Sequence, residues 1–89
     1  MSDKPAPGLA FPCRYPLKVM TASGDQARAQ VLAVIAAHAE FCETRDVRLR
    51  ASGQGNFQSI TVTVTARSRS HLETLYAELH ALDAVKMML

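Results

Sequence analysis

The stretch FQSITVTVTA at Phe57–Ala66 decides the fold. Apolar and hydroxyl residues alternate along it and most are β-branched, a pattern typical of a strand with one buried face. Ile60, Val62 and Val64 would then face the core. The five residues just before it, SGQGN at 52–56, form a turn signal of hairpin length, because Gly and Asn tolerate positive φ. We therefore expect this strand to return antiparallel to the segment that precedes the turn.

Three other segments alternate with the same period of two. They are RDVRLRA at 45–51, YPLKVMTA at 15–22 and VKMML at 85–89, and each predicts a half-buried strand. The residues expected to face the core are Leu17, Val19, Thr21, Val47, Leu49, Ala51, Val85, Met87 and Leu89.

Two capping-box patterns, in which Ser is followed three residues later by Gln or Glu, mark two helices. Ser23 with Gln26 predicts a helix from residue 24 or 25 to residues 39–41. Ser70 with Glu73 predicts another from about 71 to 82. Their apolar stripes, at spacings of three and four, are Ala27, Val31, Val34, Ile35 and His38, and Leu72, Leu75, Tyr76, Leu79 and Leu82.

The resulting order, βαββαβ, is the split β-α-β or ferredoxin-like arrangement of the α+β class. Right-handed crossovers then place four antiparallel strands in the order 4-1-3-2, with both helices on one face and the other face bare. Residues 1–14, which contain three prolines and Gly8, read as a flexible or extended leader. Residues 15–89 are expected to form the single domain.

The composition excludes several classes of protein but does not identify the function. A chain of 89 residues has room for one core, and 48% hydrophobic with 20% charged residues excludes disorder, collagen and coiled coil as descriptions of the whole. The net charge of +2 is far below that of a dedicated nucleic-acid binder. Residues 31–39 are the longest mostly apolar stretch, too short for a membrane span of about 20 residues.

No motif in the sequence predicts catalysis, a cofactor or a metal. Cys13 and Cys42 are far apart, without C-x-x-C spacing, and are expected to be free thiols. The three histidines form no H-x-x-x-H pair, and no nucleophile motif or phosphate-binding loop is present. We expect a protein of the bacterial cytoplasm that is not an enzyme.

Several separated blocks resemble the YbeD-like family of small bacterial proteins. They are Phe11-Pro12, Lys18-Val19-Met20, SGQGNFQS at 52–59, LETLYAEL at 72–79 and DAVKMML at 83–89. The resemblance covers residues 11–89 and implies a ferredoxin-like fold similar to ACT regulatory domains, no established activity, and a link to lipoate metabolism inferred from gene neighbourhood. Thr21 and Phe57 stand where the family commonly has Gly and Tyr, so roles needing close backbone approach at 21 or a hydroxyl at 57 do not carry over.

Two hypotheses about function follow. The first is a small non-enzymatic regulatory or interaction module, as the resemblance to ACT-like domains implies, whose partner is an unknown protein or a small anionic ligand. The alternative is binding of RNA or another nucleic acid through the bare sheet face. That mode needs aromatic side chains on the central strands, whereas Lys18, Met20, Thr61, Thr63 and Thr65 are expected there. Nucleic acid is therefore the weaker prediction.

Three features define the candidate surface. Lys18, Arg48, Arg50 and Lys86 are expected on the bare face with only Asp46 opposing them, which suits a carboxylate or an acidic protein surface; a merely solvated face is the alternative. Met88, expected outward on the edge strand beside Met20, predicts docking of a partner or a homodimer through the last strand. The turn with Ser23 and Asp25 at a helix start could take an anion, unless Ser23 simply caps the helix. The candidate residues are Lys18, Met20, Ser23, Asp25, Arg48, Arg50, Lys86 and Met88.

Overall fold

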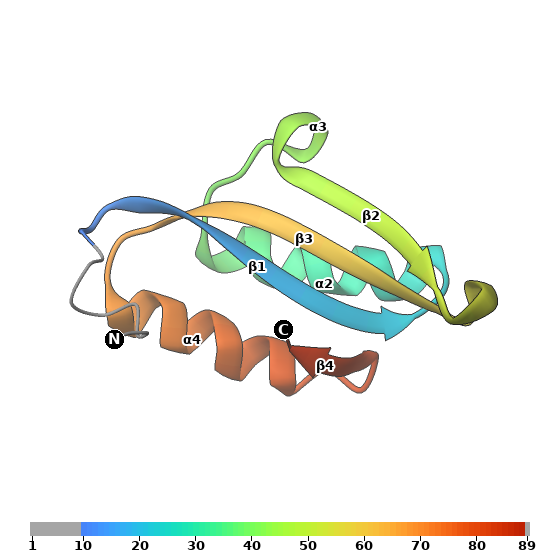
Figure 1. The fold of residues 1–89 in the computed structure, drawn as a ribbon. Coiled ribbons are helices and arrows are strands. Elements are labelled where there is room, and N and C mark those ends of the chain that lie inside the picture. Colours follow the sequence, from blue (N-terminus) through green and yellow to red (C-terminus); the bar gives the residue numbers. More distant parts are fainter. Residues whose placement is uncertain (1–9, 89) are drawn as a thin grey trace, which may run out of the picture.

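The computed structural model describes residues 10–88 as a four-stranded antiparallel sheet with two main helices (Figure 1). The strands follow the order β2-β3-β1-β4, which is the predicted order read from the other edge. The α+β, ferredoxin-like βαββαβ fold is thus confirmed. The elements are β1 Cys13–Ala22, α2 Asp25–His38, α3 Glu43–Asp46, β2 Val47–Ser52, the 3-10 turn η1 Gly53–Gly55, β3 Phe57–Ala66, α4 Arg69–His80 and β4 Val85–Met88.

β3 organises the sheet, as its alternation predicts. It pairs with β1 over ten residue pairs, from Cys13 opposite Ala66 to Ala22 opposite Phe57, and with β2 on its other side. One face of these strands packs against α2 and α4, which lie behind and below the sheet in Figure 1. The fully buried core residues are Leu17, Val19, Val31, Ile35, Ile60, Val62, Val64, Ala66, Leu75 and Leu79.

The first helix begins where expected, but Ser23 does not cap it. The N-cap is Gly24, whose φ of 130° is a conformation that favours glycine, and no side chain caps the helix. The Ser23 hydroxyl donates instead to the carbonyl of Gly55, and the Ser23 amide donates to the carbonyl of Asn56 at 3.1 Å. The capping-box prediction for Ser23 is therefore wrong, because its polar groups tie this turn to the β2–β3 hairpin.

The second helix begins two residues before its predicted start. Ser68 is the N-cap, and its Oγ accepts from the backbone N–H of His71 at 3.1 Å. His71 Nδ1 accepts in turn from the backbone N–H of Arg67 at 3.0 Å. A histidine thus takes the place that Glu or Gln has in a capping box, which is why the Ser70 pattern placed the start wrongly.

The predicted strand at 45–51 is wrong at its beginning. Arg45 and Asp46 belong to α3, a single helical turn that starts after Cys42, and β2 begins only at Val47. The Asp46 side chain accepts from the backbone N–H of Cys42 at 2.7 Å, which closes this turn. A local hydrogen bond between side chain and backbone therefore overrides the strand alternation at these two positions.

The register of β4 also differs from the prediction. Val85 lies opposite Thr21, Met87 opposite Met20 and Met88 opposite Val19, with an irregularity in between. Met88 therefore joins Val85 against the core, and Met87 lies on the open face, 51% exposed. A bulge adds one residue to one strand and so reverses every side chain beyond it. The prediction that Met88 points outward and Met87 inward is wrong.

The ends of the chain need one further correction. β1 starts at Cys13, two residues earlier than predicted, so residues 13 and 14 belong to the sheet and not to a leader. The rest of the expected leader up to residue 9, and the expected core contact of Leu89, lie outside the described residues. Between residues 10 and 88, no helix is both long and apolar enough to cross a membrane.

Candidate functional site

The open face of the sheet carries two cross-strand rows of residues that are polar except for Met20. Lys18 of β1 lies opposite Thr61 of β3, and Thr61 lies opposite Arg48 of β2. The adjacent row joins Met20, Ser59 and Arg50 in the same way. Because side chains two residues apart on a strand share a face, both rows project away from the helices.

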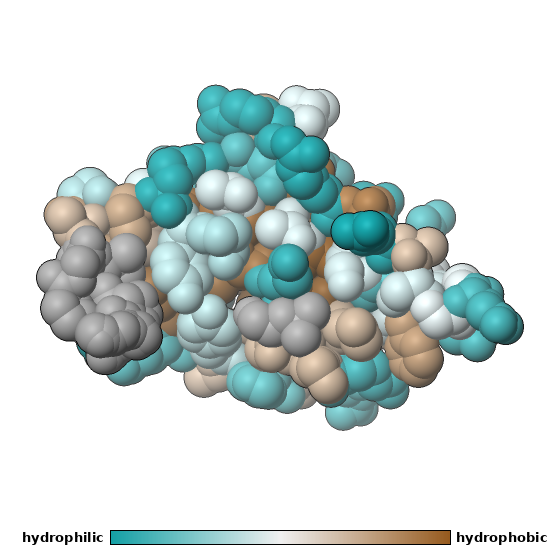
Figure 2. Space-filling model, in the orientation of Figure 1, coloured by the Kyte–Doolittle hydropathy of each residue, from teal (hydrophilic) through white to brown (hydrophobic). Residues whose placement is uncertain are grey.

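A hollow of ≈ 420 Å³ lies over these two rows. It is lined by Lys18, Arg48, Leu49, Arg50, Ser59 and Thr61. Three cationic side chains and two hydroxyl groups thus meet in one depression between β1, β3 and β2. Hydrophilic side chains gather over β2 and α3 in Figure 2, while paler residues cover the central strands. The predicted basic face is therefore present for Lys18, Arg48 and Arg50.

None of the ion pairs in the described part of the chain includes Lys18, Arg48 or Arg50. Arg14 and Arg45 pair with Asp46 at 2.6 and 2.9 Å, and Arg28 pairs with Glu43 at 3.6 Å. No carboxylate among residues 10–88 pairs with Lys18, Arg48 or Arg50. The hollow therefore keeps three positive charges that are not neutralised by these residues.

Asp46, expected to oppose the basic face from a strand, is the last residue of α3 and is almost completely buried. Its carboxylate accepts from the side chains of Arg45 and Arg14 and from the Cys42 amide. Hydrogen bonding from Arg45, then from the Cys42 amide and Arg14, holds the pKa of Asp46 well below its usual range. The Asp46 carboxylate thus neutralises Arg14 and Arg45 at one end of the sheet and does not neutralise the cations of the hollow.

Lys86 and Met88, the two candidates from the last strand, do not line this hollow. Lys86 is exposed at the irregularity of β4, and Met88 packs against the core. β4 pairs with β1 only, whereas the hollow extends from β1 toward β2. The candidate surface therefore consists of two separate parts, the basic hollow next to β2 and the residues of β4.

An apolar end of the open face was missed by sequence reasoning. Met87 is 51% exposed beside Met20, and Phe57 is 40% exposed, opposite Ala22 in the row beyond Met20. The alternation of β3 carried the signal for Phe57, since it is two residues from Ser59. No pattern in the sequence predicts that Met87 lies on the open face, because the bulge in β4 determines the face of the sheet on which it lies.

The turn between β1 and α2, the third candidate, is held by internal hydrogen bonds. Besides the two bonds of Ser23 to the hairpin, Gln58 Nε2 donates to the carbonyls of Ala22 and Gly24 at 3.3 and 3.0 Å. Asp25 is exposed in the first turn of α2, where its charge suits the helix dipole. The turn thus offers an incoming anion neither the Ser23 hydroxyl nor the Ser23 amide.

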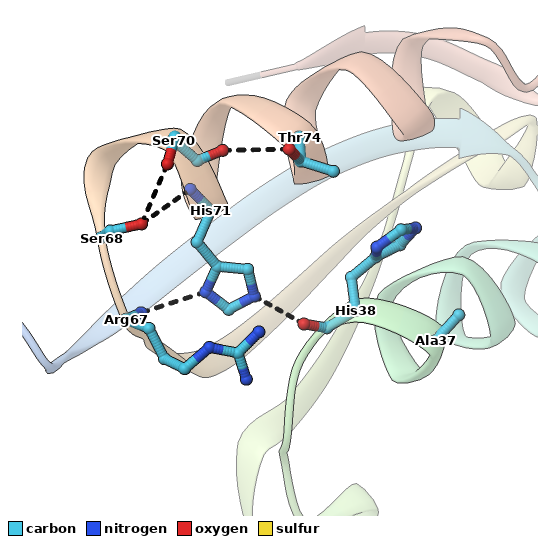
Figure 3. A pocket seen from close by; sticks show the side chains of 7 residues that line it. All are labelled: Ala37, His38, Arg67, Ser68, Ser70, His71 and Thr74. Carbon is cyan, nitrogen blue, oxygen red and sulfur yellow. Dashed lines mark hydrogen bonds between the residues drawn. The ribbon is translucent and has the colours of Figure 1, made fainter.

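A second hollow, of ≈ 380 Å³, lies between the end of α2 and the start of α4 (Figure 3). The His71 ring spans it, with Nδ1 accepting from the Arg67 amide and Nε2 donating to the His38 carbonyl at 2.5 Å. The Thr74 hydroxyl donates to the Ser70 carbonyl at 3.0 Å. The bond between His71 and His38 joins the two helices and the other bonds order the start of α4, so the hollow is better explained as a structural contact.

The two cysteines are free, Cys13 half-buried and Cys42 exposed. A hydrogen bond from the Thr44 hydroxyl, then bonds from the backbone amides of Arg45 and Thr44, lower the pKa of the Cys42 thiol. Among residues 10–88, no three side chains of His, Cys, Asp or Glu converge as a metal site would require. The open-face hollow therefore remains the strongest candidate.

Comparison with known proteins gives matches over nearly the whole chain. Residues 6–89 match the family described as "Protein of unknown function (DUF493)". The UPF0250 protein of Chromobacterium violaceum is 42% identical over 89 residues, which cover both chains completely. The UPF0250 protein of Shewanella putrefaciens is 38% identical over 83 residues, 91% of this chain and 90% of its own.

A solved structure of another protein has a similar fold. The solution structure of protein HP0495 from H. pylori matches with a TM-score of 0.72, covering all of this chain and 93% of its own. The two sequences are 20% identical, so this likeness concerns the architecture alone.

Proposed function

We propose that this chain, which belongs to the DUF493 family of YbeD-like bacterial proteins, acts by binding and not by catalysis, as a small interaction or regulatory module. Its open sheet face would take a carboxylate-rich protein partner. The observation that carries this proposal is the hollow in which Lys18, Arg48 and Arg50 meet without a counter-charge from residues 10–88.

The chemistry of the lining favours carboxylates. A guanidinium group presents a planar fork of N–H donors that matches a carboxylate with two parallel hydrogen bonds. Arg48 and Arg50 supply two such forks, and the Lys18 ammonium adds a third cation from the other side. The hydroxyls of Ser59 and Thr61 lie between them and can donate to the same oxygens. Such a surface also attracts an acidic partner before contact.

The other hypotheses receive less support. A nucleic-acid platform needs several aromatic side chains, and the described central strands offer only Phe57 on the open face, at its far end. A small anion at the Ser23 turn would have to displace bonds to the hairpin. The family resemblance adds the expectation of a role in the bacterial cytoplasm linked to lipoate metabolism, so acidic proteins of that metabolism are partners to test.

The test uses a hexaglutamate peptide as probe, with binding followed by calorimetry and by NMR shifts of backbone amides. We expect shifts at Lys18, Arg48, Arg50, Ser59 and Thr61. The double variant Lys18→Glu with Arg50→Glu should weaken binding at least about tenfold, which corresponds to about 1.4 kcal/mol. Because exposed charges contribute little to stability, its circular dichroism spectrum should be unchanged.

The matched control is Arg67→Glu with Arg69→Glu. It makes the same change in net charge at two exposed arginines beside α4, away from the open face. Equal losses in both double variants would mean that only net charge matters, and the proposal would be wrong. If single-stranded oligouridylate bound to the open face and hexaglutamate did not, the nucleic-acid alternative would replace it.

A further inference from the structure

β2 is an edge strand whose two faces differ in chemistry. In the order β2-β3-β1-β4 it pairs with β3 alone, so its outer backbone groups have no strand partner among residues 10–88. Figure 1 shows β2 along the upper margin of the sheet, above α2. Arg48 and Arg50 project from it into the hollow of the open face.

The other face of β2 is apolar, and beyond Val47, which packs against the core, it is uncovered. Leu49 lies opposite Ile60, on the side of the sheet that the helices cover, yet Leu49 is 50% exposed whereas Ile60 is fully buried. Ala51, on the same side two residues later, is also exposed. The core therefore does not cover Leu49 and Ala51, and the exposed Leu49 lies between two arginines whose side chains project to the opposite face.

We infer that the acidic partner binds as an extended strand added to the free edge of β2, with carboxylates toward Arg48 and Arg50 and an apolar residue toward Leu49. This inference rests on the proposed function and specifies how the partner binds. Strand addition pairs the unpaired backbone groups of an edge, and alternate side chains then give specificity. The partner segment must accordingly alternate acidic and apolar residues with a period of two.

Charge argues against a second copy of this chain as the occupant. If two β2 strands paired antiparallel about Leu49, Arg48 of each copy would lie opposite Arg50 of the other. Like charges directly opposite on paired strands are destabilising. The same arginines that oppose self-pairing attract carboxylates, so this edge selects an acidic strand from a different protein.

Two acetylated peptides of equal composition provide the test. The first, Glu-Val-Glu-Val-Glu-Val-Glu, places all four acids on one face when extended. The second, Glu-Glu-Val-Val-Val-Glu-Glu, does not. We expect the first to bind at least tenfold more tightly and to slow hydrogen exchange of β2 amides. Equal affinities without protection of β2, alongside binding of hexaglutamate, would overturn the strand inference and leave the proposed function standing. Failure of all three peptides to bind would overturn both.

A pair of matched variants separates strand addition from simple charge attraction. Leu49→Thr removes the apolar contact from β2 but keeps a residue that favours strands. It should weaken binding of the alternating peptide several-fold more than binding of hexaglutamate, because only the alternating peptide places an apolar side chain against Leu49. Met87→Thr, at a residue 51% exposed on the opposite edge, should change neither. Protection of β4 amides, or a larger effect of Met87→Thr than of Leu49→Thr, would overturn the assignment to β2.

Discussion

At the scale of single residues, the Asp46 carboxylate joins three parts of the chain. It closes the α3 turn through the Cys42 amide, holds the neighbouring Arg45, and reaches Arg14 of β1 at 2.6 Å. Arg14 in turn donates to Thr65 Oγ1 at 3.0 Å on the open face. A buried carboxylate with this many donors favours its charged form and fixes the start of β2 against the central strands.

Asp46→Asn is therefore expected to lower the thermal midpoint near pH 7. Because the folded state depresses the pKa of Asp46, its stabilisation is fully present above the unfolded pKa of about 3.9 and is lost gradually as pH falls from there toward the much lower pKa of the folded state. The gap in midpoint between wild type and variant should thus narrow below about pH 4. Thermal unfolding followed by circular dichroism from pH 3 to 7 measures this.

The control is Glu43→Gln. Glu43 is an exposed residue whose contact with Arg28 is 3.6 Å long, so its loss should shift the midpoint little. A gap for Asp46→Asn that stayed constant across the whole pH range would show that its charge is not what stabilises the fold.

A second prediction concerns the serine that starts α4. Ser68→Ala removes the acceptor for the His71 amide and should cost about 1 kcal/mol of unfolding free energy, a typical value for a lost N-cap. Ser70→Ala, at the position that the sequence pattern indicated, should stay within about 0.5 kcal/mol. Urea unfolding of both variants measures the difference. The reverse ranking would restore Ser70 as the cap.

At the scale of elements, α4 packs its apolar side against the sheet and contributes Leu72, Leu75 and Leu79 to the core. Leu75 is fully buried among the core residues of β1, β3 and α2. Leu75→Ala should cost about 2 to 4 kcal/mol through the cavity that it leaves. Leu49→Ala makes the same chemical change at a leucine 50% exposed on β2 and should cost far less. Equal costs in urea unfolding would mean that β2 is covered in solution.

The sequence predicts some elements better than others. Elements whose bounds are set by local patterns are predicted well, whereas bounds that depend on hydrogen bonds to other parts of the chain are not. β3 was predicted to the residue because its alternation and β-branching agree with its central place in the sheet. The helix starts at Gly24 and Ser68 depend on hydrogen bonds to the hairpin and to His71, which spacing alone does not reveal. The single turn of α3 depends on the hydrogen bond that the Asp46 carboxylate accepts from the Cys42 amide.

The candidate site was predictable in part for the same reason. Lys18, Arg48 and Arg50 follow from regular alternation in β1 and β2, and the structure brings them together. Met88 was misplaced because a bulge in β4 shifts the register, which no periodicity of a four-residue strand can indicate. Ser59 and Phe57 followed the alternation but had no chemistry that singled them out.

At the scale of the whole molecule, the two edges of the sheet present opposite chemistries. The β2 edge is basic on its open face and opposes pairing with itself. The β4 edge is short and carries Met87, exposed beside Met20 of β1. Arginines protect the first edge from unwanted association, whereas the second has apolar side chains where water would favour polar ones. We therefore expect the two edges to serve different partners, an acidic segment at β2 and a copy of the chain at β4.

This contrast leads to a prediction about the oligomeric state. We expect the 9.7 kDa chain to self-associate at micromolar concentration through β4, since pairing there extends the sheet and covers Met87 and Met20. Met87→Glu should return light scattering to the mass of one chain without loss of stability. Met88→Glu should instead lower the unfolding midpoint, because Met88 packs against the core. A wild type that stays at 9.7 kDa up to high micromolar concentration would show that β4 does not mediate self-association. A Met88→Glu variant that is both stable and monomeric would show that Met88 points outward after all.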